Sequence, residues 1–418
     1  RHERMGASMF AFYRGTANIM AADLGTQPNS GLDVQLCGDA HLSNFGLFAA
    51  PDRVPVFDLN DFDETNPGPF EWDVKRLAVS FMLAAADVNL PTSAGQSAAR
   101  EAAAQYRRSM VQYSQMHELD IWYNRVDASA LETWATNDLS QRAGMNITKS
   151  IARAKARTMW TAVQKLSEVV DGRRRFLDEP PVLVRVPDGS MAKQLVMNVW
   201  PEYLATLAPD RRALLDRYEM VDLGHKVVGV GSVGLLAWVM LLQGRDDNDI
   251  LVLQIKQAQA SVLEPFTAPS VYPQHGERVV QGQRLIQAAS DSFLGWVTGK
   301  MGRQYYVRQL RDMKWSPDPS KFNEAGLMLY ATLCGHVLAR AHARSGDAIA
   351  LASYMGRSDA FERAIEDFCD SYVVTVAQDY QEFQDACASG RLASGDTTTD
   401  LAQYHAAMMT PIPPPPGG

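Results

Sequence analysis

The chain has 418 residues, of which 46% are hydrophobic and 21% are charged. This composition is typical of a folded globular protein with two or three domains, or of one large two-lobed enzyme. The 48 acidic residues outnumber the 40 basic ones, so the formal net charge is −8 and a general nucleic-acid-binding protein is not expected. The longest apolar run, around Val233–Leu242, is too short to cross a bilayer, so no membrane partner is expected either.

The four cysteines are widely spaced and form no C-x-x-C pair: Cys37, Cys334, Cys369 and Cys387. This spacing favours free thiols over a disulfide framework or a metal cluster, and free thiols are typical of a reducing compartment. We therefore predict a cytoplasmic protein.

In chain order, the first predicted elements are strands. Residues 31–63 have the pattern of a strand, a polar loop, a second strand, a turn and a third strand. From Trp72 the apolar positions recur at helical spacing, which predicts a helix to about residue 88. Two further helices are expected near 96–117 and 145–170.

The middle of the chain changes to short apolar segments separated by Gly- or Asp-rich turns, which predicts strands. They are PVLVRV (181–186), KVVGVG (226–231), GLLAWVMLL (234–242), DILVLQIK (249–256), FLGWVT (293–298) and QYYVRQL (304–310), with a helix expected near 276–290. Helices return at 321–343 and 358–388, and the Pro-rich end is expected to be disordered. The chain is therefore predicted to be an α+β protein with a helical part (1–178), a small antiparallel sheet-rich part (179–314), a second helical part (315–405) and a tail (406–418).

The first chemical motif is GDAHLSN, residues 38–44. It places Asp39, His41 and Asn44 within six positions. A carboxylate that orients a hydroxyl and an amide oxygen that binds Mg²⁺ are both needed for phosphoryl transfer, although a polar turn could have the same residues.

A second motif follows a predicted strand. Asp58, Asp61, Asp63 and Glu64 lie within seven residues and repel one another unless a cation neutralises them. A divalent-metal site is the simplest explanation, and a solvated acidic turn is the alternative.

Together the two motifs resemble the catalytic and metal-binding loops of the aminoglycoside-phosphotransferase and protein-kinase superfamily. The family pattern G-D-x-H-x-x-N is met by Gly38, Asp39, His41 and Asn44, and the metal segment is similar to residues 60–64 followed by Trp72 and Asp73. The resemblance implies that Asp39 orients the acceptor hydroxyl, that His41 shapes the loop through hydrogen bonds, and that Asn44, Asp61 and Asp63 bind Mg²⁺. Asp58 is kept as the alternative to Asp61, because Asp61 follows Asn44 by seventeen residues, about four more than is usual in these kinases.

A third motif, VVGVGSVGLL, contains a G-x-G-x-x-G pattern with Gly229, Gly231, Ser232 and Gly234. It resembles the kinase Gly-rich loop, with Lys256 on the next strand binding the α- and β-phosphates of ATP. In that case Glu277, or alternatively Glu264, would pair with Lys256. The same letters also fit a strand–turn–helix site for NADP, which would make residues 226–257 part of an oxidoreductase.

The order of these motifs is rotated relative to ordinary kinases, because Asp39 precedes Lys256 by more than two hundred residues. The resemblance therefore implies a two-lobed kinase-like fold that is circularly permuted. With only about ten residues between Asp63 and the helix at Asp73, there is no room for a peptide-binding segment, so a small hydroxylated acceptor is expected. The strings FAFYRG, GDAHLSNFG and NDFDE also resemble an uncharacterised bacterial family of unknown function. Two further alternatives are a pseudokinase and a nucleotidyltransferase.

Overall fold

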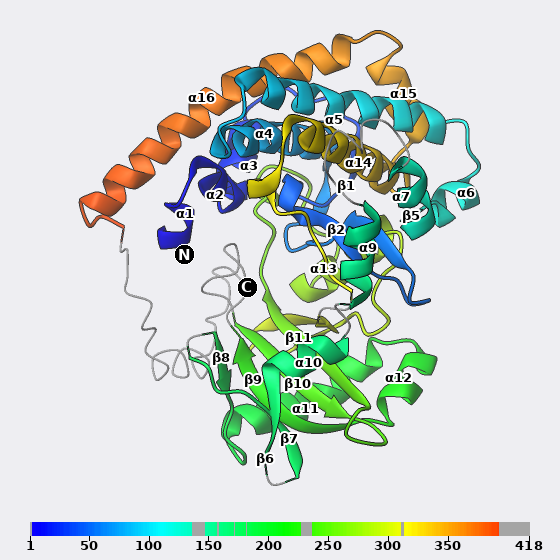
Figure 1. Cartoon of the computed structure of the whole chain (residues 1–418), viewed down its shortest axis with the longest axis vertical. Coiled ribbons are helices and arrows are strands. Elements are labelled where there is room, and N and C mark those ends of the chain that lie inside the picture. Colours follow the sequence, from blue (N-terminus) through cyan, green and yellow to red (C-terminus); the bar gives the residue numbers. More distant parts are fainter. Residues whose placement is uncertain are drawn as a thin grey trace.

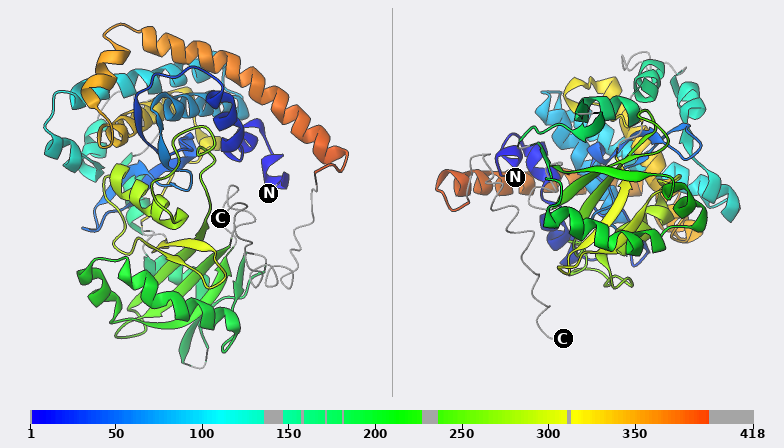
Figure 2. Two further views of the ribbon diagram at one scale, coloured as in Figure 1. Left: turned by 180° about the vertical axis from the view of Figure 1, so that it is seen from behind. Right: turned by 90° about the horizontal axis from the view of Figure 1, so that it is seen from below.

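The computed structural model describes residues 2–135, 147–156, 159–170, 172–180, 182–226, 236–310 and 313–392. These residues form a mixed α+β protein with a helical lobe and a sheet lobe (Figure 1). The view from behind shows the same two lobes, with the N-terminal helices beside the helical one (Figure 2). Within the described ranges, no helix is long and apolar enough to cross a membrane.

The sheet lobe is built on one antiparallel sheet of six strands in the order β12-β13-β11-β10-β9-β8. Its central strands are buried on both faces, which explains why β10 is an unbroken apolar run. The strands are β8 (Leu183–Arg185), β9 (Glu219–Lys226), β10 (Ala237–Gln243), β11 (Ile250–Ala258), β12 (Gly295–Thr298) and β13 (Gln304–Gln309). Three helices belong to this part of the chain: α11 (Met191–Ala205), α12 (Pro209–Leu215) and α13 (His275–Ile286).

The helical lobe combines both ends of the chain. Helix α14 (Glu324–Ala343) is capped at its N-terminus by Asn323, whose side chain accepts the Gly326 N–H. The helix is buried nearly all round because it lies at the centre of the lobe. It packs most closely on α5 (Thr92–Tyr113). Around this pair lie α4 (Glu71–Asp87), α15 (Ala348–Met355) and α16 (Ala360–Ala388).

Short elements connect the lobes or cover their edges. Strand β1 (Asp33–Leu36) pairs with β4 (Asn66–Pro69), and β2 (Phe45–Ala49), β3 (Pro55–Leu59) and β5 (Val126–Asp127) form a three-stranded sheet. The remaining helices are α1 (His2–Met5), α2 (Met9–Arg14), α3 (Ala17–Gly25), α6 (Glu118–Tyr123), α7 (Ala128–Ala135), α9 (Ile147–Ala156) and α10 (Met159–Leu166). Strands β6 (Ser167–Val170) and β7 (Arg173–Phe176) form a hairpin.

Most predicted elements are present, and two differ. The single helix expected at 145–170 is instead α9, α10 and then strand β6, whose residues pair with β7. The segment between PVLVRV and KVVGVG contains helices α11 and α12 and most of strand β9, none of which was predicted. The strand expected at KVVGVG lies outside the described residues except for Lys226, the last residue of β9. The expected Pro-rich tail lies outside the described residues.

Residues 237–243 decide between the two interpretations of the glycine motif. A dinucleotide-binding motif needs a helix directly after its last glycine, whereas β10 is a strand that pairs antiparallel with β9 and β11. The helix that the NADP interpretation requires is therefore absent at residues 237–243. Gly229, Gly231, Ser232 and Gly234 lie outside the described residues.

Candidate active site

One face of helix α4 holds the GDAHLSN loop. Asp73 accepts the backbone N–H groups of Cys37 and Gly38, at 2.8 Å and 3.1 Å. One turn further on, Arg76 binds the carboxylate of Asp39. Because residues three and four apart lie on the same side of a helix, this single face fixes the approach of the chain to Asp39.

The Asp39 carboxylate is oriented by Arg76. Arg76 Nε donates to Asp39 Oδ1 at 2.9 Å, and Arg76 Nη2 lies 2.8 Å from the same oxygen in an ion pair. The Asp39 side chain is 21% exposed. Asn44 Nδ2 donates to the backbone carbonyl of Asp39 at 2.8 Å. Arg76 thus occupies Oδ1 and leaves Oδ2 as the oxygen that can meet an acceptor hydroxyl.

His41 has a different role from the one expected. Burial lowers the pKa of His41 to about 4, so the ring is neutral at pH 7. Its Nε2 lies 3.7 Å from Asp39 Oδ2, beyond hydrogen-bond distance. Hydrogen bonds that shape the loop come from the His41 backbone instead: its N–H donates to the Asp39 carbonyl, and its carbonyl accepts the Asn44 N–H.

The β2–β3 hairpin brings the GDAHLSN loop and the acidic segment that follows β3 together. Strands β2 and β3 pair antiparallel, with Phe45 opposite Leu59, and the Asn60 N–H donates to the Asn44 carbonyl at 3.0 Å. Residues 45–59 are therefore folded back on themselves, which brings Asn44 next to Asn60, the residue before Asp61, despite the separation in sequence.

Asp58 and Asp61 lie in different environments. Asp58 is fully buried, and both of its oxygens lie 2.8 Å from Arg340 Nη2. Asp61 lines a cavity between the lobes. Burial would raise its pKa, but the charges of Lys256, Arg308 and Lys314 outweigh burial and lower the pKa of Asp61. Asp58 is thus part of the core, and Asp61 is the ionised carboxylate that faces the cavity.

Lys256, on β11, reaches across to the metal segment. Its ammonium forms an ion pair with Asp63 Oδ2, and Tyr306 Oη donates to Asp63 Oδ1 at 2.7 Å. Burial would lower the pKa of Lys256, but Asp63, Tyr306 and Asp61 raise it, so the amine is charged. Since both oxygens of Asp63 are engaged, this residue anchors Lys256 in the structure, and its expected ligation of a metal ion stays a prediction.

Lys256 does not pair with Glu277, its expected partner on α13. Within the described part of the chain, Glu277 forms no ion pair, and Glu264 lies 3.6 Å from Arg278 Nε. The reason is that α13 directs Arg278 at the metal segment, where it donates to the backbone carbonyls of Asp63 and Thr65. Helix α13 therefore holds the metal segment through Arg278, and Asp63 replaces Glu277 and Glu264 as the partner of Lys256.

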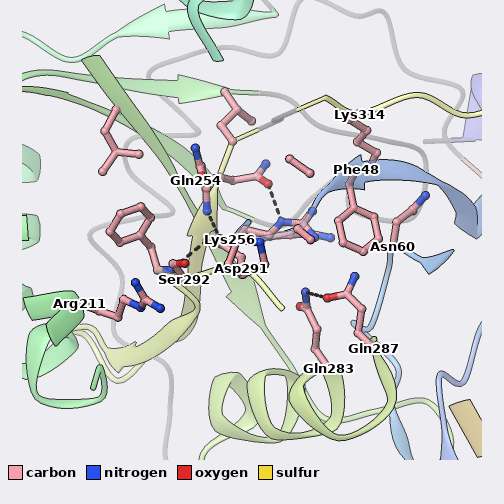
Figure 3. Close-up of a pocket in the computed structure, with 18 of the residues that line it drawn as sticks. Phe48, Asn60, Arg211, Gln254, Lys256, Gln283, Gln287, Asp291, Ser292 and Lys314 are labelled. Atoms are coloured by element: carbon pink, nitrogen blue, oxygen red, sulfur yellow. Dashed lines mark hydrogen bonds between the residues drawn. The ribbon is translucent and has the colours of Figure 1, made fainter. Parts of the chain in front are cut away.

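The cavity between the lobes has a volume of about 850 Å³. Figure 3 shows Gln254 and Lys256 extending from the sheet, Gln283 and Gln287 from a helix, and Phe48 and Asn60 on the opposite side. Among the described residues, the cavity is lined by six basic side chains and by two acidic ones, Asp61 and Asp291. The basic side chains are Arg53, Arg211, Lys226, Lys256, Arg308 and Lys314. This surplus of positive charge favours an anionic ligand.

The residues present fit a magnesium ion that arrives on a nucleotide. No three His, Cys, Asp or Glu side chains of the described ranges converge on one point, so a metal site made by the protein alone is not formed there. Mg²⁺, however, is usually bound by one or two protein oxygens together with substrate phosphates. Asp61 supplies an ionised carboxylate, and Asn44, whose amide nitrogen is bound to Asp39, keeps its amide oxygen for such an ion.

Several site residues were not found from the sequence. Arg76 has a signal, since Asp73, Arg76 and Ser80 recur at helical spacing within an otherwise apolar helix, and Ser80 accepts the Leu42 N–H at 3.0 Å. Tyr306 and Arg308 have none, because only the pairing of β13 with β11 brings them beside Lys256.

Gly38 is required where the two motifs touch. Its φ of +83° is in the left-handed region, and a Cβ there would overlap the Glu64 carbonyl. We expect Gly38→Ala to lower the free energy of unfolding by about 2 kcal/mol or more, as measured by urea denaturation. Gly31→Ala is the matched control, because Gly31 has a φ of +69° with no atom near its Cβ position. Equal losses in the two variants would show that the contact with Glu64 is unimportant.

These features define a class of protein. It is a two-lobed α+β molecule with a basic cavity between the sheet that carries Lys256 and the loop that carries Asn60 and Asp61. Residues 1–386 match the sequence model of the family described as "Uncharacterized protein conserved in bacteria (DUF2252)", and the chain belongs to that family. Neither the curated proteins nor the solved structures gave a match.

Proposed function

We propose that the chain is an ATP- and Mg²⁺-dependent phosphotransferase that acts on a hydroxyl group of a small molecule, on a circularly permuted kinase-like fold. The observation that supports it best is that Lys256 from the sheet lobe and Asp61 from the helical lobe line one cavity, while Asp63 from the same segment forms an ion pair with Lys256. A triphosphate needs cationic groups, and its metal ion needs oxygen ligands. Both kinds of group meet here, although they are about two hundred residues apart in the sequence.

In the proposed phosphoryl transfer, each residue of the site has a separate role. Lys256 binds the nucleotide phosphates, and Asp63 with Tyr306 fixes the position of its ammonium group. Asn44 and Asp61 would hold Mg²⁺, which neutralises charge on the phosphates when it is bound. Asp39, held by Arg76 and α4, orients the acceptor hydroxyl and accepts its proton late in transfer.

Nucleotide binding tests the proposal. ATP with Mg²⁺ should raise the melting temperature of the full chain. At an ATP concentration of a hundred times Kd, the expected gain in the free energy of unfolding is about 2.7 kcal/mol. NADPH should have no effect. We expect Lys256→Met to remove this shift, measured against the variant's own melting temperature without ligand. Lys300→Met is the control, since Lys300 lies on the sheet lobe as an exposed side chain paired with Glu202. A shift of equal size in both variants would contradict the assignment.

The two remaining alternatives differ in the product. A pseudokinase would bind ATP without turnover. A nucleotidyltransferase would add an AMP group to its acceptor, so the mass of the product separates it from a phosphotransferase. The cationic cavity and the well-oriented Asp39 favour phosphoryl transfer over binding alone.

A further inference from the structure

The FAFYRG motif, residues 10–15, has no role in the reaction described so far, yet it lies against the active site. Helix α2 contains most of it and packs on α4. Tyr13 Oη donates to the Arg76 carbonyl at 3.0 Å, and the Arg76 guanidinium lies 3.8 Å from the centre of the Tyr13 ring. This packing brings the next residue, Arg14, into the electrostatic field of Asp39.

Arg14 is a partly buried cation without a counter-charge in the described part of the chain. Its Nε is buried and has no hydrogen-bond acceptor there, and the guanidinium forms no ion pair. The Arg14 guanidinium carbon lies 5.7 Å from the centre of the Phe10 ring. Burial lowers the pKa of Arg14, although Asp39 opposes the effect. Holding a cation in this state costs free energy, which is explained if a ligand supplies the anion.

Two more buried nitrogen atoms near Asp39 have no hydrogen-bond partner among the described residues. They are Nη1 of Arg76 and Nδ1 of His41, on side chains that are 3% and 4% exposed as whole residues. Arg76 is already fixed, because it also donates to Asp39 and to the Tyr13 carbonyl. The Asp39 carboxylate thus has Arg76 in direct contact and Arg14 within the range of its charge, and buried polar groups of this kind normally have hydrogen-bond partners. Guanidinium groups match carboxylates and phosphates in geometry as well as in charge.

We infer that the acceptor is itself an anion: a small hydroxylated molecule with a carboxylate or phosphate group, which Arg14 binds beside Asp39 with Arg76 and His41 as further donors. The inference rests on the proposed function. In the reaction, the acceptor oxygen forms a bond to the γ-phosphorus while the bond from that phosphorus to the β–γ bridging oxygen breaks. ADP leaves, and the hydroxyl proton passes to Asp39 Oδ2.

Binding measurements on the full chain test this. We would titrate glycerol 3-phosphate, D-glycerate and glycerol, by calorimetry, into protein saturated with Mg²⁺ and a non-hydrolysable ATP analogue. The two anions should bind at least about ten-fold more tightly than glycerol, and Arg14→Gln should weaken them by about ten-fold. The control is Arg4→Gln, which removes the same charge from an exposed position on α1 and should change nothing.

Each other result has a definite meaning. If the anions bind no better than glycerol, or if Arg14→Gln leaves their affinity unchanged, the inference is wrong while the proposed function stands. If Arg14→Gln weakens the ATP analogue instead, Arg14 binds the nucleotide and the inference is also wrong. If the analogue fails to bind wild-type protein but the anions bind through Arg14, the anion site is upheld and the phosphotransferase proposal fails.

Discussion

We expect Asp39→Asn to lower the turnover of ATP with its acceptor by about 10²-fold or more, and to leave the dissociation constant for ATP with Mg²⁺ unchanged. The amide keeps the size of the carboxylate but cannot accept the hydroxyl proton. ATP affinity is preserved because Asp39 does not line the cavity, which Asp61 and Lys256 do. Turnover would be measured by the release of ADP, and affinity by calorimetry.

The matched control for this prediction is Asp33→Asn. Asp33 is an exposed residue at the start of β1, a few positions before the same loop, so the substitution is chemically identical but outside the site. Turnover should remain at the wild-type value. A loss of ATP affinity in Asp39→Asn as large as its loss of turnover would show that Asp39 binds the nucleotide rather than orienting the acceptor.

The largest loss of stability is expected at the buried pair of Asp58 and Arg340. Arg340→Met should lower the free energy of unfolding by about 3–5 kcal/mol, because it leaves the fully buried Asp58 carboxylate without its counter-charge. Among the described residues, the backbone N–H groups of Leu59 and Ala288 would then remain as its partners. Urea denaturation of wild type and variant measures the difference.

An exposed pair gives the comparison. Arg363 and Asp359 form an ion pair in which both side chains are largely exposed, so Arg363→Met should cost less than about 1 kcal/mol. Adding Asp58→Asn to Arg340→Met should recover part of the loss, since the unpaired charge is removed. If Arg340→Met were as mild as Arg363→Met, Asp58 would not have the structural role assigned to it, and its separation from Asp61 in function would be unsupported.

The elements that the sequence predicted best have strong local patterns. The β2–β3 hairpin and helices α4 and α14 follow from alternating or helical apolar spacing. The placement of Asp61 is harder to predict than that of Asp39, because Asp58 and Asp61 have the same chemistry. Only the packing of α14 against β3, which brings Arg340 to Asp58, distinguishes them.

What the sequence did not predict depends on contacts between distant segments. Lys256 pairs with Asp63, 193 residues away, and nothing local to Lys256 favours Asp63 over Glu277. Arg14 lies within the range of the Asp39 charge because α2 packs on α4. Helix α11 was missed for a different reason. It contains Pro201 and lies in a part of the chain where the other predicted segments were strands. Tertiary packing therefore outweighed the local signal against a helix.

The most direct test of the central claim is the binding of Mn²⁺, used in place of Mg²⁺ and followed by electron paramagnetic resonance. The account predicts that wild-type protein binds Mn²⁺ tightly only when ATP is present, and that both Asp61→Asn and Lys256→Met abolish this ATP-dependent binding, although the two residues belong to different lobes. Binding of Mn²⁺ that needs no ATP, or that survives both substitutions, would contradict it.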